Sequence, residues 1–266
     1  MGYNIIIYII TLLLLLYALI PKEDIFIEHN DEEYFHKFKH KLISNLESNN
    51  KLSKPINKKN RILIITYDNR SNLPYINLHN TNLNSYAKKW GFKYKFLTKC
   101  VHNVYWCKIH MVLEELKTNL YDYVMWLDSD TYIFNQNINL SNIVNSYSSD
   151  IFLGSDNNEL YDITNAGVFI IKNSTVGKNY LQDCIDSFPK SICMNNDGTL
   201  KGKWAASCYE QGIMNILIAN KYQTAVTILP NSLIYNKDIC KNDVFIMHLY
   251  GSSNDKRLAC FNSKNK

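Results

Sequence analysis

Residues 121–135 (YDYVMWLDSDTYIFN) constrain the fold and chemistry of this chain most, because a buried-strand pattern there runs directly into two carboxylates. Residues 124–127 are all apolar, which is the pattern of a strand buried on both faces of a parallel sheet. Asp128 and Asp130 follow this run. Because positions i and i+2 of an extended chain point the same way, both carboxylates are expected to converge beyond the carboxyl end of the strand, where open α/β sheets bind ligands.

The acidic pair fits three kinds of structure. Two converging carboxylates suit a hard divalent cation that also takes oxygens from a phosphate-bearing substrate. A turn that closes the strand through Asp128 and Ser129 is a second interpretation. A phosphatase of the haloacid dehalogenase type is the third, but Tyr132 stands where it has a smaller residue, and two predicted strands precede the pair. An EF-hand is excluded, because Ile133 and Asn139 replace its glycine and glutamate.

The remainder of residues 61–266 predicts an α/β domain. Strands are predicted over 62–66, 92–97 and 123–127 and helices over 76–90, which Gly91 ends, and 105–118. This alternation indicates right-handed crossovers and a mostly parallel, Rossmann-like central sheet flanked by helices. The second half is less regular, with strands predicted over 151–154, 167–171, 225–229 and 244–249, helices over 140–146, 176–188 and 208–220, and a loop over 189–203.

The N-terminus predicts a membrane segment. Residues 5–20 carry no charge and would span about 24 Å as a helix, enough for a thin membrane. We interpret residues 1–21 as the signal-anchor helix of a single-pass type II membrane protein; a cleaved signal peptide is the alternative, although the chain lacks a basic start and an Ala-x-Ala site. The catalytic domain is then expected in a lumen such as that of the Golgi or endoplasmic reticulum, where sequons at Asn69, Asn139 and Asn173 could carry glycans.

Residues 22–60 are expected to form a stem. Apolar side chains recur at three- and four-residue spacing from Tyr34 to Leu46, which predicts one amphipathic helix. Residues 49–60, with Pro55, have the composition of a linker. The helix either docks on the domain or pairs with a second copy, which would make a homodimer.

Net charge and cysteine content indicate which binding partners and which redox compartment to expect. The net charge of +5 is spread without a basic block, so nucleic acid is not an expected partner. Seven cysteines in a secretory context are compatible with disulfides, and their odd number leaves at least one thiol free. Buried reduced thiols are the alternative, and the absence of Cys-x-x-Cys argues against zinc.

Five short stretches recur in a recognisable order: Trp106-Cys107-Lys108, residues 126–130 (WLDSD), residues 165–173 (NAGVFIIKN), Glu210-Gln211, and residues 245–251 (FIMHLYG). In this order they resemble the nucleotide-sugar glycosyltransferases of the GT-A fold. Within that fold they resemble glycosyltransferase family 34, which includes fungal α-galactosyl- and α-mannosyltransferases and plant xyloglucan xylosyltransferases. The Glu-Gln pair is commonly Asp-Gln in relatives, and the segment after Gly251 departs from the family pattern, so the donor sugar stays open.

The resemblance implies a role for each matched residue. Asp128, Asp130 and His248 would ligate Mn²⁺ or Mg²⁺, and the imidazole would favour Mn²⁺ over Ca²⁺. Glu210 and Gln211 would face the transferred sugar and stabilise positive charge at its anomeric carbon. The remaining contacts to the nucleotide sugar would come from Thr66, Tyr67, Lys108, Asp128, Ser129, Asn165, Gly167, Gly251 and Lys256.

Several of these residues also have a structural interpretation that the sequence leaves open. His248 could be a buried, hydrogen-bonded histidine, Lys108 a solvated charge on a helix, and Glu210 a carboxylate favoured at the start of a helix. Thr66 and Tyr67 could form an ordinary strand end, and Asn165 and Gly167 a turn. Lys256 and Arg257 either form a lid over the diphosphate or belong to a surface tail.

The expected reaction is the metal-dependent transfer of a hexose or pentose from a UDP- or GDP-sugar to a hydroxyl of a glycan or glycoprotein. Retention of the anomeric configuration is implied by the resemblance alone. The acceptor is expected among the longer loops of the second half. A non-catalytic, membrane-anchored glycan-binding relative and the phosphatase stay open as alternatives.

Overall fold

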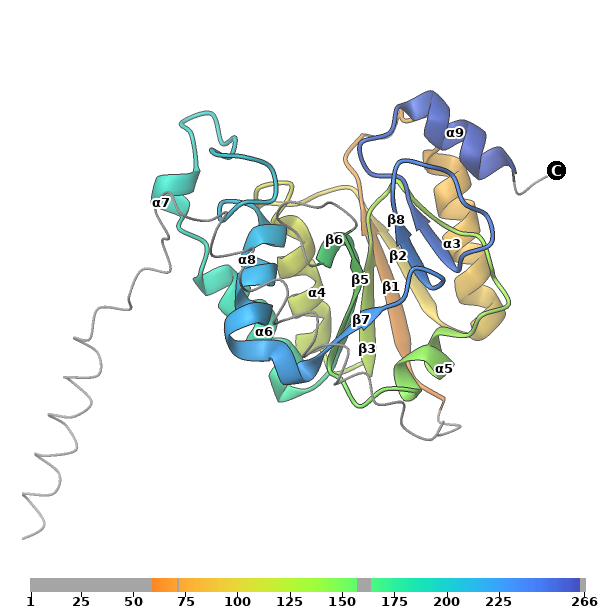
Figure 1. Cartoon of the computed structure of the whole chain (residues 1–266), viewed down its shortest axis with the longest axis horizontal. Coiled ribbons are helices and arrows are strands. Elements are labelled where there is room, and N and C mark those ends of the chain that lie inside the picture. The colour runs from red at the N-terminus through yellow and green to blue at the C-terminus, as the bar shows by residue number, and fades with distance from the viewer. Residues whose placement is uncertain (1–58, 71, 157–163, 264–266) are drawn as a thin grey trace, which may run out of the picture.

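The computed structural model describes residues 59–70, 72–156 and 164–263 (Figure 1). The expected signal-anchor helix over 1–21 and all but the last two residues of the stem over 22–60 lie outside the described residues. Within the described ranges, no helix combines the length and the hydropathy needed to cross a membrane.

A six-stranded sheet with the order β2-β1-β3-β6-β5-β7 forms the centre of the domain (Figure 1). β1 pairs in parallel with β2 and β3, and β5 with β7, whereas β6 is antiparallel to β3 and β5. The sheet is therefore mixed, although only β6 reverses the common direction. The strands are β1 (Ile62–Tyr67), β2 (Lys93–Leu97), β3 (Tyr123–Leu127), β5 (Ile151–Ser155), β6 (Thr164–Lys172) and β7 (Val226–Leu229).

The reversal at β6 has a simple cause. The segment between β5 and β6 is shorter than the dozen or more residues that a parallel crossover needs, so the two strands pair antiparallel. The prediction for β3 is confirmed: all five of its residues are buried. Val124 and Trp126 pack into the core on one face of the sheet, and Met125 and Leu127 into the core on the other.

Helices cover both faces of this sheet (Figure 1). One face carries α4 (Cys107–Lys117), α6 (Thr175–Asp186) and α8 (Glu210–Leu217), and the other carries α3 (Ile76–Trp90) and α5 (Leu140–Asn145). The predicted stop of α3 is confirmed, because Gly91 adopts a left-handed φ of 72° and its N–H caps the helix. The helix expected over 208–220 begins only at Glu210 and continues as η1 (Ile218–Tyr222) and η2 (Gln223–Ala225).

A second, three-stranded sheet with the order β4-β9-β8 was not predicted. It consists of β4 (Thr131–Ile133), β8 (Ile234–Asn236) and β9 (Ile246–His248), the last lying within the strand expected over 244–249. β4 and β9 are antiparallel, with Thr131 opposite His248. This register places His248, at the end of β9, beside Asp130, which directly precedes β4.

Two segments that were expected to be irregular contain helices. The loop expected over 189–203 includes α7 (Lys190–Cys193), and the segment after Gly251 forms α9 (Asn254–Asn262). α9 packs near α3, where the rings of Tyr75 and Phe261 meet edge to face. Lys256 and Arg257 therefore belong to an ordered helix and not to a flexible tail.

Six of the seven cysteines form disulfides. The pairs are Cys100–Cys107, Cys193–Cys208 and Cys240–Cys260, and Cys184 is a buried free thiol.

Candidate active site at the carboxyl ends of the strands

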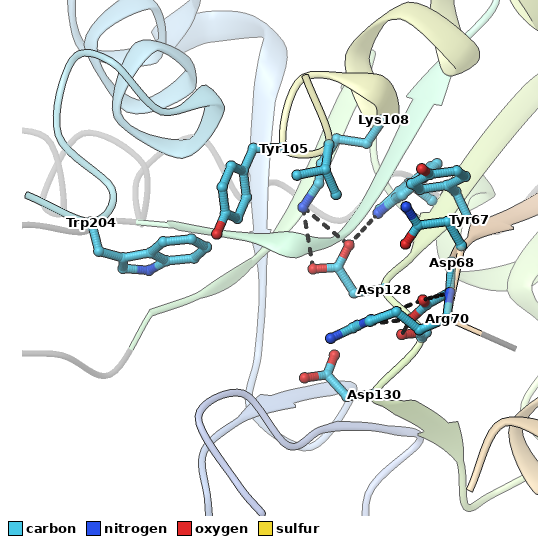
Figure 2. Close-up of a pocket in the computed structure, with 12 residues that line it drawn as sticks. Tyr67, Asp68, Arg70, Tyr105, Lys108, Asp128, Asp130 and Trp204 are labelled. Carbon is cyan, nitrogen blue, oxygen red and sulfur yellow. Dashed lines mark hydrogen bonds and ion pairs between the residues drawn. The ribbon is translucent and has the colours of Figure 1, made fainter. Parts of the chain in front are cut away.

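A cavity of about 400 Å³ opens where β1 and β3 end. Its walls come from the segment after β1, the start of α4, the end of β3 and the loop that precedes α8, and Figure 2 shows their side chains around the carboxylate of Asp128. The lining residues are Tyr67, Asp68, Asn69, Arg70, Val104, Tyr105, Lys108, Trp126, Asp128, Ser129, Asp130 and Trp204. Five of the residues predicted from the sequence are among them: Tyr67, Lys108, Asp128, Ser129 and Asp130.

Asp128 is held by two side chains. The Nζ of Lys108 lies 3.0 Å from its Oδ1 (Figure 2), and the indole Nε1 of Trp126 donates to the same oxygen at 2.6 Å. Trp126 can do so because it lies two residues earlier on an extended strand and points the same way. Asp128 is thus fixed before any ligand binds.

Lys108 is shared between two carboxylates. Its Nζ also lies 3.0 Å from the Oε1 of Glu210 and donates to the carbonyl of Ala166 at 3.3 Å. Burial alone lowers the pKa of Lys108, but the charges of Asp128 and Glu210 outweigh burial and hold that pKa above its ordinary value. Lys108 is therefore a buried, permanent cation and not the solvated helix charge that the sequence left open.

Glu210 is buried behind this lysine. Burial raises its pKa, and the positive charge of Lys108 acts in the opposite direction. Its Oε2 has no hydrogen-bond partner among the residues that the structure describes. Lys108 is thus the group that compensates the charge of Glu210.

Asp130 lies between an imidazole and a guanidinium. Its Oδ1 is 3.2 Å from the Nε2 of His248, and its Oδ2 accepts a hydrogen bond from the Nη2 of Arg257 at 2.7 Å. Burial raises the pKa of Asp130, but His248 and Arg257 together lower it below the ordinary value, so the carboxylate stays ionised.

The orientation of His248 is set by Asn236. The Nδ2 of Asn236 donates to the carbonyl of Ser155 at 2.8 Å, which leaves its Oδ1 as the acceptor for the Nδ1–H of His248 at 3.0 Å. Nε2 is therefore the nitrogen that faces Asp130. Hydrogen bonding of the distal ring nitrogen is the usual arrangement of a metal-ligating histidine.

The backbone at Gly167 makes room for this histidine. A Cβ at position 167 would stand 2.1 Å from the Cε1 of His248. The resemblance implies that Gly167 contacts the nucleotide sugar, whereas the close approach seen here is to the imidazole.

Asp128, Asp130 and His248 suit a divalent cation. One ligand atom from each residue lies within 4.8 Å of the others. Two carboxylates and one imidazole nitrogen are a donor set for Mn²⁺ or Mg²⁺, and the hydrogen bond that His248 Nδ1–H donates to Asn236 leaves Nε2 directed at the carboxylates. The residues present therefore fit the metal that the sequence predicted.

Asn165 and Gln211 hold the start of β6 against α8. Gln211 accepts the N–H of Ala166 at 2.9 Å and donates to Asp156 at 3.2 Å, and Asn165 donates to the same carboxylate at 3.2 Å. Asn165 also accepts the N–H of Gly167 at 2.7 Å. Contacts from Glu210, Gln211 and Asn165 to a sugar stay predictions, because these side chains do not line the described cavity.

Three other predicted site residues lie elsewhere. The buried hydroxyl of Thr66 bonds to His79 of α3 at 3.2 Å, Gly251 forms an open turn with a φ of 65°, and Lys256 reaches Asp238 at 3.3 Å. The neighbour of Lys256, Arg257, makes the contact to Asp130 instead.

Asp68 and Arg70 were not among the residues predicted from the sequence, yet both line the cavity. The Nη2 of Arg70 lies 2.8 Å from the Oδ2 of Asp68, which also accepts the hydroxyl of Ser129 at 2.5 Å. The argument that identified Asp128 and Asp130 could have found them, since they follow β1 as that pair follows β3. Tyr105 and Trp204 carried no comparable sequence pattern, because the folding of two loops brings them together.

Comparisons with known proteins agree with this fold. Residues 57–258 match the model of a family described as nucleotide-diphospho-sugar transferase. A crystal structure of a glycosyltransferase involved in the glycosylation of the major capsid of PBCV-1 is similar with a TM-score of 0.58 and 13% identity, over 76% of this chain and 99% of that one. The glycosyltransferase GlyE of Streptococcus pneumoniae TIGR4 aligns with a TM-score of 0.49 and 13% identity, over 78% of this chain and 61% of that one. No curated protein sequence matches the chain.

Proposed function

The chain belongs to the nucleotide-diphospho-sugar transferase family and is a glycosyltransferase, and we propose that it is metal-dependent and moves a hexose or pentose from a UDP- or GDP-sugar to a hydroxyl of a glycan or glycoprotein. The observation that carries this proposal is the convergence of Asp128, Asp130 and His248 at the edge of the cavity. Family membership favours sugar transfer over the phosphatase and over a non-catalytic relative.

The charges of the site are arranged for a leaving diphosphate. Asp128, Asp130 and His248 would hold Mn²⁺ or Mg²⁺, which as a Lewis acid stabilises negative charge on the leaving group. Arg257 contacts Asp130, and Asp130 and Arg70 both line the cavity. Two guanidinium groups would therefore lie close to a diphosphate that binds at the metal ligands. Preorganised charges of this kind are worth most in a partly buried site, because they need no reorganisation during the reaction.

The chain also offers groups for the transferred sugar. Lys108 keeps a positive charge beside Asp128, and Glu210 behind it supplies a buried negative charge near the start of β6. We assign Glu210 and Gln211 to stabilising the cation-like sugar. Retention of the anomeric configuration and membership of glycosyltransferase family 34 are part of the proposal and rest on the sequence resemblance.

We also propose that residues 1–21 anchor the protein in a membrane with its catalytic domain in the lumen, and that the stem could join two copies. The three disulfides support an oxidising compartment. Of the three sequon asparagines, Asn69 is exposed but lines the cavity, and the side chain of Asn139 caps α5. Glycosidase treatment and protease protection test this topology: a shift in mobility and resistance in sealed membranes are expected, and an unglycosylated, protease-accessible domain would refute it.

The catalytic proposal is tested with the full chain and a panel of UDP- and GDP-sugars in Mn²⁺. We expect release of the nucleoside diphosphate from at least one donor, loss of that release on chelation, and a loss of at least 100-fold in Asp130→Ala. Asp243→Ala is the matched control, because the side chain of Asp243 is 71% exposed and contacts only Lys241 at 3.8 Å among the described ion pairs. Failure to turn over any donor, or full activity of Asp130→Ala, would defeat the proposal.

A further inference from the structure

Three aromatic side chains gather on one side of the cavity. The rings of Tyr105, Trp204 and Tyr209 lie 5.0 to 5.1 Å apart, centre to centre. Tyr105 and Trp204 line the cavity, and Trp204 is 62% exposed. Figure 2 shows both on one side of Asp128, with Tyr67 on the other and the side chain of Arg70 extending towards Asp130. We call Tyr105, Trp204 and Tyr209 the aromatic wall.

Two disulfide-closed loops carry Tyr105 and Trp204 of the aromatic wall, and Tyr209 directly follows the second of them. Tyr105 lies between Cys100 and Cys107, and Trp204 lies between Cys193 and Cys208. The loops are also bonded to each other, because Asn103 donates to the carbonyl of Gly198 at 3.0 Å and the indole of Trp106 donates to the carbonyl of Cys208 at 3.2 Å. These links fix the aromatic wall in place, so little conformational entropy is lost in the wall when a ligand binds there.

The backbone next to Trp204 is held as well. Ala205 has a φ of 60°, which an L-residue adopts only at a cost of about 1–2 kcal/mol. Gly212 of α8 allows this turn to pack tightly, since a Cβ there would stand 2.2 Å from the carbonyl oxygen of Ala206. Strained backbone is concentrated at active sites and ligand-binding sites, so the turn at Ala205 points to a ligand-binding role for the exposed face of Trp204.

The distribution of charge divides the cavity between two ligands. One side of the cavity is charged and suits a diphosphate: it holds the three candidate metal ligands together with Arg70 and Arg257. Tyr67, at the end of β1, lies on this charged side (Figure 2). The aromatic wall is neutral, and Val104 beside it is apolar and 50% exposed. Neutral aromatic faces suit a ligand with an apolar C–H face and hydroxyl groups at its edge, which describes a sugar ring.

We propose that the aromatic wall is the binding site for the acceptor sugar, which stacks on Trp204. The inference rests on the proposed transferase function and adds the location of its second substrate. It places the acceptor across Asp128 from the diphosphate, so that the transferred sugar lies between them. The competing occupant is the nucleobase of the donor, which would stack on the same indole.

Fluorescence quenching separates the two occupants. Of the four tryptophans, Trp106 and Trp126 are 2% exposed and Trp90 is half-buried, so iodide quenching reports mainly on Trp204. In the full chain, we expect at least one oligosaccharide ending in galactose, mannose, glucose or xylose to reduce quenching, and UDP or GDP with Mn²⁺ to leave it unchanged. Protection by the nucleotide alone, or by none of the oligosaccharides, would overturn the inference.

Kinetics provide the second readout. Trp204→Ala should raise the KM for the acceptor about ten-fold and change the KM for the donor less than two-fold, and Trp204→Phe, which keeps an aromatic face, should restore most of the loss. Ile192→Ala is the control, because Ile192 is 53% exposed and does not line the cavity. An unchanged acceptor KM in Trp204→Ala would overturn the inference while leaving donor hydrolysis, and with it the proposed function, intact; a wild-type protein that hydrolyses no donor would instead refute the function.

Discussion

The Cα of Gly167 packs directly against the imidazole of His248, so closely that a Cβ would stand 2.6 Å from both ring nitrogens. The two residues lie on different sheets: β6 of the central sheet provides the space, and β9 of the small sheet fills it. The position of the candidate metal ligand therefore depends on a missing side chain as much as on its hydrogen bond to Asn236.

Gly167→Ala tests this relationship. The added methyl must displace the ring, because a Cβ does not approach non-bonded atoms this closely. We expect Mn²⁺ affinity, measured by calorimetric titration of the full chain, to fall about 10- to 100-fold. Gly198→Ala is the control: a Cβ there meets no atom within 4 Å, so that variant should keep its affinity despite its own positive φ. Equal affinities would contradict the role of Gly167.

Asn236→Leu should weaken metal binding by a different route. The substitution keeps the approximate size of the side chain and removes the acceptor for the Nδ1–H of His248, so the imidazole can rotate or change tautomer. We again expect a loss of about 10- to 100-fold in Mn²⁺ affinity, measured by electron paramagnetic resonance of free Mn²⁺. Asn236→Asp retains an acceptor oxygen and should lose less. If both variants bind Mn²⁺ like the wild type, the bond to Asn236 does not set the position of His248.

The buried cluster of Lys108, Glu210 and Asp128 predicts a non-additive pair of substitutions. Lys108→Met leaves the carboxylate of Glu210 buried without a cation and should reduce the free energy of unfolding by about 3–5 kcal/mol. Adding Glu210→Gln removes that charge, so the double variant should recover part of the loss. Chemical denaturation of the four proteins at neutral pH measures the coupling. Strictly additive effects would show that the pair does not interact.

His79 predicts a dependence of stability on pH. Burial lowers its pKa to about 4 from 6.5, and its ring nitrogens bond to Thr131 and Thr66. Between these two pH values the unfolded chain binds a proton that the folded chain does not, so stability falls as the pH drops from 6.5 towards 4, by roughly 3 kcal/mol in total from this group. His79→Gln lacks this contribution and should show a shallower decline between pH 7 and 4.5. An identical slope would contradict the buried neutral state.

Local patterns were sufficient to predict the elements as far as β3 and the acidic pair that follows it. The burial of β3 follows from four consecutive apolar residues, and the end of α3 follows from Gly91 at a left-handed position. Both are decided within a few residues of the chain. Lys108 is the second residue of a helix that begins at the cavity, but its role rested on the resemblance, and its partners Asp128 and Glu210 are distant in the chain.

Long-range pairing decided the features that the sequence did not predict. β4 and β8 are only three residues long, too short for a period-2 pattern, and they form because β9 pairs with both. Arg257 reaches Asp130, 127 positions away in the chain, because α9 packs near α3. Tyr105 and Trp204 meet through two disulfides and the bonds between their loops, and neither connectivity nor loop conformation can be read from spacing.

Gly212→Ala links the packing of α8 to acceptor binding. The new Cβ would stand 2.2 Å from the carbonyl oxygen of Ala206 and 2.5 Å from that of Ala205. Backbone atoms cannot rotate away as a side chain could, so the turn after Trp204 must shift and move the indole. We expect a rise of several-fold in the KM for the acceptor, with Mn²⁺ affinity changed less than two-fold, because the metal ligands lie on β3, β4 and β9 or directly beside them.

A destabilised protein could lose acceptor affinity for a trivial reason, so Ile218→Val is the matched control for Gly212→Ala. Ile218 is fully buried next to the same helix, and its truncation costs about 1 kcal/mol without touching the turn at Ala205. Similar acceptor KM values in the two variants would mean that stability, and not the position of Trp204, controls acceptor binding. A rise confined to Gly212→Ala would show that α8 sets the position of the indole.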